Sequence, residues 1–428
     1  MGTIGTILRG VVGILTQPSG RHSVVVQPYR GYGSHEEMFL MGRVFREPGA
    51  AAGPERQSPQ RDVRDLARLL LRHGIKDAVL TIQLGTVRQR VMTDRNGYFR
   101  VRMRLPEPPP ADRLWHQVDV ELLRPVQVSV KGEFFTPPNA ARFVVISDID
   151  DTVMETGVAN RITMLQRLFL QTAEKRLAFP GVASFYRAMH MGLSGRELNP
   201  MLYVSRGPWS IYEMLDRFFR LHDIPVGPIL FLREWGLTLQ HPLPHRGNDH
   251  KLNLIRGMLS LYRDLPFVLF GDSGQHDPEI YTQVVEEHPG RVLAVYIRNV
   301  TRAPERRQAI EALARKVVDS GSSLVLAADS FIMAEHAVEH GLISAEALAE
   351  VLRERTQQQG EADLKPVQEV MRPSPGETHE AIDRGELSEA IEADTGEPSP
   401  PNVIVEPEQD QAAERIERPS SEDSRQNP

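Results

Sequence analysis

The chain has 428 residues, of which 40% are hydrophobic and 25% charged, and its formal net charge is −7. This length and composition are typical of a soluble globular protein with two or three domains and a large core. The sequence contains no cysteine, which excludes disulfides, thiolate metal sites and a cysteine nucleophile and fits a reducing compartment.

The charge is unevenly distributed along the chain. From residue 361 to the end, 18 acidic and 6 basic residues give −12, so the first 360 residues carry +5. A mildly basic folded part suits an anionic substrate or surface, whereas nothing in it is typical of a nucleic-acid-binding module. The last part is rich in Glu, Pro, Ser and Gln, which predicts a disordered acidic tail over residues 355–428.

The sequence gives little indication of a membrane segment. It has no run of 18 apolar residues, so we expect no membrane span. The N-terminus has no basic leader before an apolar block, so we expect no secretory signal and a cytoplasmic location. Apolar residues between Ile4 and Leu15 recur at helical spacing but are interrupted by glycines. They favour a segment docked on its own domain over a short membrane-surface anchor, and both interpretations stay open.

The first third of the chain has the pattern of an antiparallel β-domain. Several segments alternate apolar and polar residues, as expected for strands with one buried face, and Asn96-Gly97 favours a hairpin turn. We predict an N-terminal β-rich, sandwich-like domain over residues 1–138, with a helix inserted at residues 62–73 and a loop at residues 29–33 that is either structural or ligand-binding. The predicted strands cover residues 23–29, 37–45, 78–84, 88–93, 98–105, 116–123 and 126–135.

A cluster of carboxylates follows the apolar run at residues 143–146, which has the pattern of a buried parallel strand. Asp148, Asp150 and Asp151 come directly after it, followed by Thr152. Like charges this close repel one another unless a cation intervenes, and Mg²⁺ is the usual cation where phosphate is bound. The alternative is a strand that simply ends in an acidic turn.

Two later strands also end in polar residues. Residues 201–205 end in Ser205, and residues 267–270 are followed by Asp272 and, five positions on, by Asp277. Further strands at residues 292–297 and 324–327 alternate with helical segments. This order predicts a doubly wound parallel α/β sheet over residues 139–354, with the polar residues gathered at its carboxyl edge.

Three further features leave alternatives open. Lys251 lies near the start of a predicted helix, where a cation is disfavoured by the helix dipole, so it either binds a phosphate or is an ordinary exposed lysine. The amphipathic pattern after Gly157 indicates either a lid over the site or a helix packed on the sheet. His241, His245 and His250 could form a zinc site but are more often solvated in such a loop.

Taken together, these motifs resemble two related groups of proteins. A D-x-D-x-T strand end, a later strand-end serine, a lysine and a G-D-S-x-x-x-D strand end are similar to the haloacid dehalogenase (HAD) superfamily of phosphotransferases. The segments PYRGYG, ISDIDDTVMETG, YVSRGPW, GDSGQHDPEIY and AVYIRNV resemble the phosphatidate phosphatase family first described in yeast cortical actin patches, which has many bacterial members. The resemblance covers residues 23–335 and departs from the family at Arg206-Gly207, where Asn-Ser is expected.

The resemblance implies a HAD-like Rossmannoid fold and specific catalytic roles. It implies that Asp148 attacks phosphorus and forms an aspartyl-phosphate, and that Asp150 acts as general acid and then general base. It assigns phosphate binding to Thr152, Ser205 and Lys251, with Thr152 also supporting the turn that positions Asp150. The implied cofactor is Mg²⁺, held by Asp148, the carbonyl of Asp150, Asp272 and Asp277.

Three functions follow as hypotheses. The first is a Mg²⁺-dependent phosphatase that hydrolyses phosphatidate to diacylglycerol and phosphate, in peripheral contact with a membrane surface. The second retains the chemistry on a soluble phosphomonoester. The third is a non-catalytic scaffold in which the β-domain binds a protein partner that the sequence does not identify.

Overall fold

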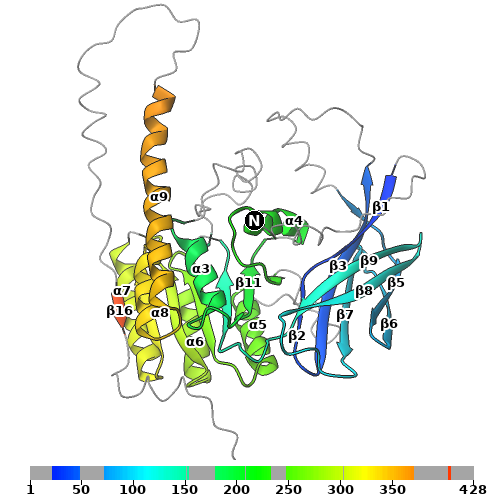
Figure 1. The fold of residues 1–428 in the computed structure, drawn as a ribbon, viewed down its shortest axis with the longest axis horizontal. Helices are drawn as coiled ribbons and strands as arrows, with labels where there is room; N and C mark the ends of the chain where they lie inside the picture. The colour runs from blue at the N-terminus through cyan, green and yellow to red at the C-terminus, as the bar shows by residue number, and fades with distance from the viewer. Residues whose placement is uncertain are drawn as a thin grey trace, which may run out of the picture.

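The computed structural model describes residues 22–48, 72–150, 152–153, 179–207, 209–232, 247–301, 303–370 and 403–405. These residues form two β-sheets that lie side by side, and the described helices all belong to the part of the chain that forms the second sheet (Figure 1). Several predictions fall outside the described residues: the segment from Ile4 to Leu15, residues 62–71 of the inserted helix, Asp151, the helix after Gly157, and both His241 and His245. The last two residues of the predicted inserted helix are described and are not helical, because Arg72 is irregular and His73 begins strand β4.

The N-terminal part is the predicted antiparallel β-rich region. Its strands form one nine-stranded sheet that runs through β3, and only the β2–β9 pair is parallel. Alternate residues of the strands point into a single apolar core, which includes Leu40, Leu80 and Phe99. The strands are β1 (His22–Pro28), β2 (Gly31–Gly33), β3 (Glu37–Pro48), β4 (His73–Gly74), β5 (Val79–Leu84), β6 (Val87–Met92), β7 (Tyr98–Arg104), β8 (Trp115–Arg124) and β9 (Val128–Phe135).

The second sheet is the predicted parallel α/β sheet. Its order is β12-β11-β10-β13-β14-β15-β16, and every neighbouring pair is parallel except β15–β16. The strand order therefore reverses at β10, which places the polar ends of β10, β11 and β13 at one edge. The strands are β10 (Val144–Asp148), β11 (Met201–Ser205), β12 (Ile229–Phe231), β13 (Phe267–Asp272), β14 (Val292–Arg298), β15 (Ser323–Ala327) and β16 (Val403–Val405).

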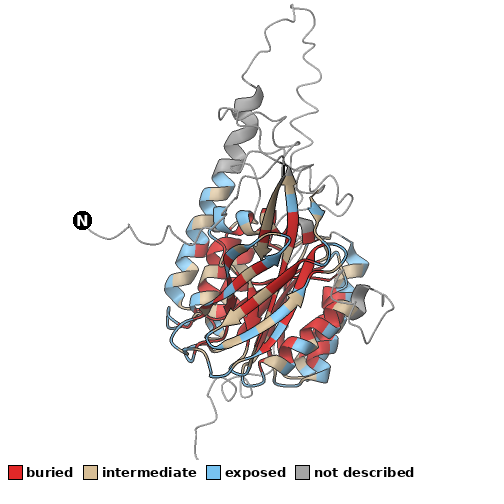
Figure 2. Ribbon diagram, turned by 90° about the vertical axis from the view of Figure 1, so that its right-hand side faces the viewer, coloured by how far each residue is buried: buried red, intermediate tan, exposed pale blue. Residues whose placement is uncertain are grey.

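Helices cover both faces of this sheet, so the residues of β10 to β15 are almost wholly buried (Figure 2). One face packs against α3 (Val182–Met191), α4 (Tyr212–Leu221), α8 (Ser330–Glu339) and α9 (Ala345–Val370). The other face packs against α5 (Gly247–Leu261), α6 (Asp277–Glu287) and α7 (Pro304–Asp319). None of the described helices has the length and apolar character needed to cross a bilayer.

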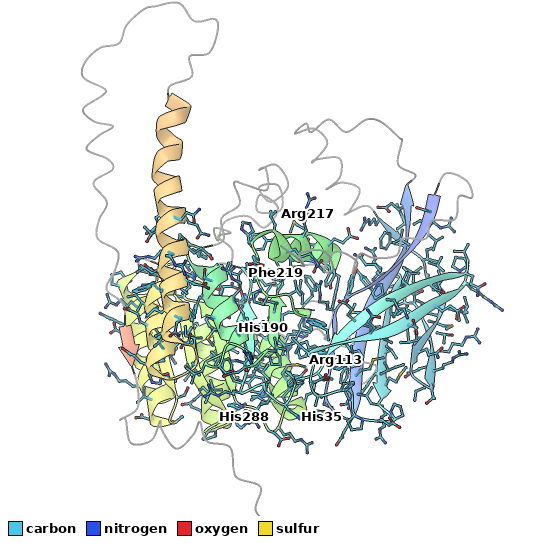
Figure 3. All side chains as sticks on the ribbon, in the orientation of Figure 1. His35, Arg113, His190, Arg217, Phe219 and His288 are labelled. Atoms are coloured by element: carbon cyan, nitrogen blue, oxygen red, sulfur yellow. The ribbon has the colours of Figure 1, made fainter. Side chains whose placement is uncertain are left out.

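The segment after β1 joins the two domains. The backbone N–H of Arg30 donates a hydrogen bond to the Tyr212 hydroxyl of α4 at 2.9 Å, and its guanidinium pairs with Asp216 of the same helix. The ring of Tyr29 stacks on Trp209, with centroids 5.1 Å apart. Figure 3 draws the side chains of both domains and labels Arg217 and Phe219 of α4. The predicted loop at residues 29–33 therefore has a packing role, and part of it is strand β2.

The predicted disordered tail is corrected at two places. Helix α9 runs on to Val370, past the boundary predicted at residue 354. A residue beyond that point contacts the rest of the domain: Gln358 Oε1 accepts a hydrogen bond from the Gly181 N–H at 3.0 Å. Strand β16 then pairs antiparallel with the edge strand β15. Three consecutive β-branched residues favour this strand, although the composition of the surrounding tail predicts disorder.

Candidate active site

The predicted acidic residues meet at the carboxyl edge of the parallel sheet. Asp148 ends β10 and Asp272 ends the neighbouring β13, while Asp277 begins α6. Carboxylate oxygens of these three residues lie within 4.8 Å of one another, and all three side chains are buried. Among the described residues, this is the one group of side chains whose composition and spacing suit a metal ion; His250, on α5, is not part of it.

Lys251 lies inside this carboxylate cluster. Its ammonium donates hydrogen bonds to Asp148 Oδ1 at 2.7 Å and to Asp277 Oδ1 at 2.6 Å, and its side chain is fully buried. Burial lowers the pKa of Lys251, but the charges of Asp148 and Asp277 outweigh burial and raise it. The two carboxylates thus favour the charged form of the lysine, and its full burial excludes the exposed-lysine alternative.

The environment of Asp148 disfavours its charged form in the metal-free protein. Burial raises the pKa of the Asp148 carboxyl most, and the charges of Asp277, Asp150 and Asp272 raise it further against the lowering effect of Lys251. One ammonium thus faces four carboxyl groups. A divalent cation would offset the remaining repulsion and favour the ionised Asp148.

The loop from Gly271 to Asp277 is shaped to bring its two aspartates together. A Cβ at position 271 would lie 2.4 Å from Asp277 Oδ2, so only glycine fits there. Asp277 Oδ2 accepts a long hydrogen bond from the Asp272 N–H at 3.3 Å. Asp272 Oδ1 in turn accepts from the N–H groups of Gly274 and Gln275, at 2.8 and 2.9 Å. These contacts fix the side chain of Asp272 toward β10.

The side-chain amide of Gln275 occupies the centre of the cluster. Its Nε2 donates to Asp272 Oδ2 at 2.7 Å and lies 3.4 Å from both Asp148 Oδ2 and the Asp150 carbonyl. Three oxygens from three residues therefore converge on one point, and oxygen ligands of this kind suit Mg²⁺. Sequence reasoning missed Gln275, although it lies within the segment GDSGQHDPEIY, between Asp272 and Asp277.

The remaining predicted residues lie at the same edge. Asp150 is only partly buried, in contrast to Asp148, and its carbonyl faces Gln275. Ser205 ends β11 one residue beyond Val204, which pairs with Asp148, and its hydroxyl accepts a hydrogen bond from the Gly207 N–H at 3.0 Å. A Cβ at Gly207 would come within 3.1 Å of that hydroxyl.

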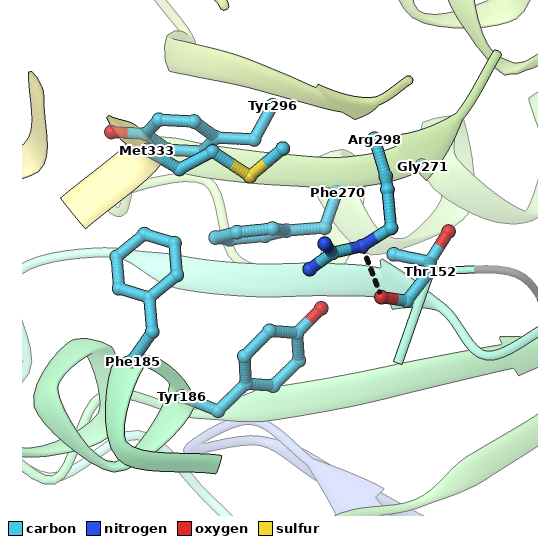
Figure 4. Close-up of a pocket in the computed structure, with 8 residues that line it drawn as sticks. All are labelled: Thr152, Phe185, Tyr186, Phe270, Gly271, Tyr296, Arg298 and Met333. Atoms are coloured by element: carbon cyan, nitrogen blue, oxygen red, sulfur yellow. Dashed lines mark hydrogen bonds between the residues drawn. The ribbon is translucent and has the colours of Figure 1, made fainter. Parts of the chain in front are cut away.

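Thr152 supports the turn after Asp148 through its backbone. Its N–H donates to the Ile149 carbonyl at 3.4 Å, and its own carbonyl accepts from Arg298 Nε at 3.0 Å. Arg298 also donates to the Ala328 carbonyl and to Ser330 Oγ, at 2.9 and 2.8 Å. This arginine, also missed from the sequence, connects the turn to the end of β15. A narrow pocket lies beside the turn (Figure 4), and half of its lining residues are aromatic; it is lined by Thr152, Phe185, Tyr186, Phe270, Gly271, Tyr296, Arg298 and Met333.

Arg206 adds a second cation beside Ser205. Within the described structure its Nε and Nη2 atoms are buried without a hydrogen-bond partner. A buried donor that lacks a partner costs free energy, so this guanidinium is suited to an anionic ligand. It stands where the sequence departs from the family pattern.

The domain that carries this site is similar to a phosphatase catalytic domain. Residues 143–299 match the family model described as phosphatidate phosphatase APP1, catalytic domain. All of the predicted site residues fall within this range, together with Arg206, Gln275 and Arg298. The match covers less than half of the chain and does not include the N-terminal β-domain.

Two yeast proteins match over nearly the same share of the chain. Phosphatidate phosphatase APP1 of Saccharomyces cerevisiae is 31% identical over 155 residues, which is 36% of this chain and 25% of that protein. An uncharacterized protein of Schizosaccharomyces pombe is 32% identical over 163 residues, again 36% and 25%. The matched part is thus about a quarter of the length of these relatives. The comparison with a ferredoxin-NADP⁺ reductase structure from Plasmodium falciparum covers 64% of this chain and 96% of that one, at 10% identity and a TM-score of 0.15.

Proposed function

We propose that this chain is a phosphatase that hydrolyses phosphatidate to diacylglycerol and phosphate through an aspartyl-phosphate on Asp148. The observation that carries the proposal is the contact of Asp148 with two different partners. Lys251 contacts one of its carboxylate oxygens, and the Gln275 amide approaches the other at the centre of the cluster. The similarity of residues 143–299 to the phosphatidate phosphatase catalytic domain supports the choice of reaction.

In the first step, Asp148 Oδ1 attacks phosphorus, the Asp–O–P bond forms and the bond to the leaving alkoxide breaks. Asp150 gives its proton to that alkoxide. The partial exposure of Asp150 suits this role, because the leaving group departs toward solvent. Lys251 lies beside the attacking oxygen, so its ammonium is placed to contact a phosphoryl oxygen as negative charge develops.

In the second step, Asp150, now a carboxylate, takes a proton from a water molecule. The resulting hydroxide attacks phosphorus, the Asp148–phosphorus bond breaks and phosphate is released. Ser205 offers its hydroxyl and Arg206 its guanidinium to the phosphoryl oxygens, both from the end of β11. Thr152 contributes by holding the turn that carries Asp150.

The donor set fits Mg²⁺ by chemistry and by placement. Asp148 Oδ2, the Asp150 carbonyl and Asp272 Oδ2 are the three oxygens that converge on the Gln275 amide nitrogen. Asp277 contacts Lys251 and the Asp272 N–H, so it would orient the metal ligands without binding the metal directly. When bound, the cation would neutralise phosphoryl charge and keep Asp148 ionised.

The proposed substrate is a lipid, so the proposed location is cytoplasmic with peripheral contact at a membrane surface. The test is phosphate release by the full chain from phosphatidate in mixed micelles and from glycerol 3-phosphate, with Mg²⁺ and with EDTA. We expect Mg²⁺-dependent release from phosphatidate that Asp148→Asn abolishes.

The matched control is Asp119→Asn, which changes an exposed aspartate paired with Lys131 on the β-domain. It should leave the rate unchanged. Much faster hydrolysis of the soluble ester would assign the same chemistry to a soluble substrate. Lack of turnover on both substrates would contradict the proposed activity.

A further inference from the structure

Gln275 has an unusual position for a neutral side chain. Its amide nitrogen lies among three oxygen acceptors that belong to Asp148, Asp150 and Asp272. The nitrogen must be the atom that faces them, because the amide oxygen would be repelled by the same three acceptors. The two N–H groups therefore supply positive partial charge at the point where the carboxylates crowd together.

The same point is the best position for a divalent cation. Mg²⁺ binds oxygen ligands at about 2.1 Å, and the three acceptors around Gln275 Nε2 come from two carboxylates and one carbonyl. An amide nitrogen 2.7 Å from Asp272 Oδ2 and a cation bound to that oxygen cannot share the space. The side chain and the metal are mutually exclusive occupants.

The backbone of Gln275 is held, whereas its side chain is able to move. Arg306 donates to the carbonyls of Ser273 and Gln275, at 2.8 and 2.6 Å, and also pairs with Glu279. The Gln275 N–H is bound by Asp272 Oδ1. The side chain itself is only half-buried, between the exposed residues Gly274 and His276. Rotation about its own bonds would carry the amide out of the cluster without moving the loop.

We propose that Gln275 is a built-in competitor of the divalent cation. In the metal-free protein its amide bridges the crowded carboxyl groups and stabilises the fold, and it must rotate away before the metal binds. The bonds that are lost in this rotation lower the affinity for metal, so Gln275 sets the metal concentration at which the site is filled. This inference rests on the proposed metal site but not on the identity of the substrate.

The test measures Mg²⁺ binding by the full chain in the absence of substrate, by titration calorimetry and by thermal unfolding. Gln275→Ala removes the competing amide, and Gln275→Met removes it while retaining the length and packing of the side chain. We expect both variants to bind Mg²⁺ about tenfold more tightly than the wild type, as the loss of a hydrogen bond to a charged group implies. Both should melt at a lower temperature without metal and gain more from added Mg²⁺.

Gln283→Ala is the matched control. Gln283 is an exposed glutamine of α6, and its side-chain amide donates a hydrogen bond to Glu287, away from the carboxylate cluster. Its Mg²⁺ affinity should equal that of the wild type. Equal or weaker Mg²⁺ binding by Gln275→Met overturns the inference, since the side chain would then be neutral or helpful to the metal. A protein that follows the expected binding pattern but releases no phosphate contradicts the proposed function alone.

Discussion

The ammonium of Lys251 lies 2.6 Å from Asp277 Oδ1 and is shared between that carboxylate and Asp148. Sharing matters because a lysine paired with Asp148 alone would hold the proposed nucleophile in a tight buried ion pair. Asp277 draws part of the ammonium's hydrogen bonding away, and so leaves Asp148 able to react. Asp277 is therefore a positioning residue that acts through Lys251.

Asp277→Asn tests this role. The substitution retains the shape of the side chain but removes its charge, so Lys251 should pair more strongly with Asp148. We expect kcat on phosphatidate to fall at least about tenfold, and the free energy of unfolding to fall by about 2 kcal/mol, because a hydrogen bond between charged groups is weakened in a buried site. Kinetics and urea unfolding measure the two effects.

Asp319→Asn, at the exposed end of α7, is the control and should change neither quantity. A normal turnover rate in Asp277→Asn would mean that the contact with Lys251 serves stability alone.

Much of this architecture is predictable from local patterns. The antiparallel strands begin and end within a few residues of the predicted ones, because alternation fixes which face is buried. The parallel strands were predictable as short apolar runs before polar residues. The shortest described strands, β2, β4, β12 and β16, were missed, since two or three residues carry too little periodicity to be distinguished from a loop.

The unpredicted parts of the site depend on contacts between distant segments. Gln275 and Arg298 lie within the segments GDSGQHDPEIY and AVYIRNV, but their roles arise from oxygens contributed by other segments of the chain. The partners of Lys251, Asp148 and Asp277, could not be predicted for the same reason, because they lie far from it in the sequence. The prediction ended helix α9 too early because the average composition of the acidic tail outweighed the few residues, such as Gln358, that contact the start of α3 at Gly181.

Arg206→Gln tests whether the second cation beside Ser205 binds the substrate. Two of its buried nitrogens have no hydrogen-bond partner in the described structure, so a phosphoryl group would satisfy them. We expect KM for phosphatidate to rise about tenfold with kcat changed less than about twofold, since the lost interaction is made in the ground state as well as in the transition state. Steady-state kinetics separate the two constants.

Arg217→Gln removes an exposed arginine of the adjacent helix α4 and should leave KM unchanged (Figure 3). An equal rise of KM in both variants would point to a general effect of positive charge on the lipid surface instead of a specific contact.

His336 predicts a pH dependence of stability. Burial, and then the charge of His340, lower the pKa of His336 from 6.5 to about 3. The unfolded chain therefore binds a proton below pH 6.5 that the folded chain excludes, so stability is lost as the pH falls through the interval between these values. We expect this residue to lower the free energy of unfolding by about 2 kcal/mol between pH 7 and pH 5.

The measurement is urea unfolding of the wild type and of His336→Gln at both pH values. The variant should be less stable at pH 7, because His336 is buried and bonded to the Tyr296 hydroxyl at 3.0 Å. Its loss of stability toward pH 5 should nevertheless be smaller than that of the wild type. An identical loss in both proteins would show that other groups govern acid unfolding.

Strand β16 predicts that a few residues of the acidic tail protect the edge of the catalytic sheet. Leu324, Val325 and Leu326 of β15 pair with Val405, Ile404 and Val403, so the pairing covers the backbone of an otherwise open edge strand. A chain that ends at residue 400 lacks β16, whereas one that ends at residue 406 retains it and loses only the rest of the tail. We expect hydrogen exchange in β15 to be about tenfold faster in the shorter chain and unchanged in the longer one, with more aggregation of the shorter chain. Unchanged exchange in both chains would mean that β15 is protected from within the sheet and that β16 adds nothing to it.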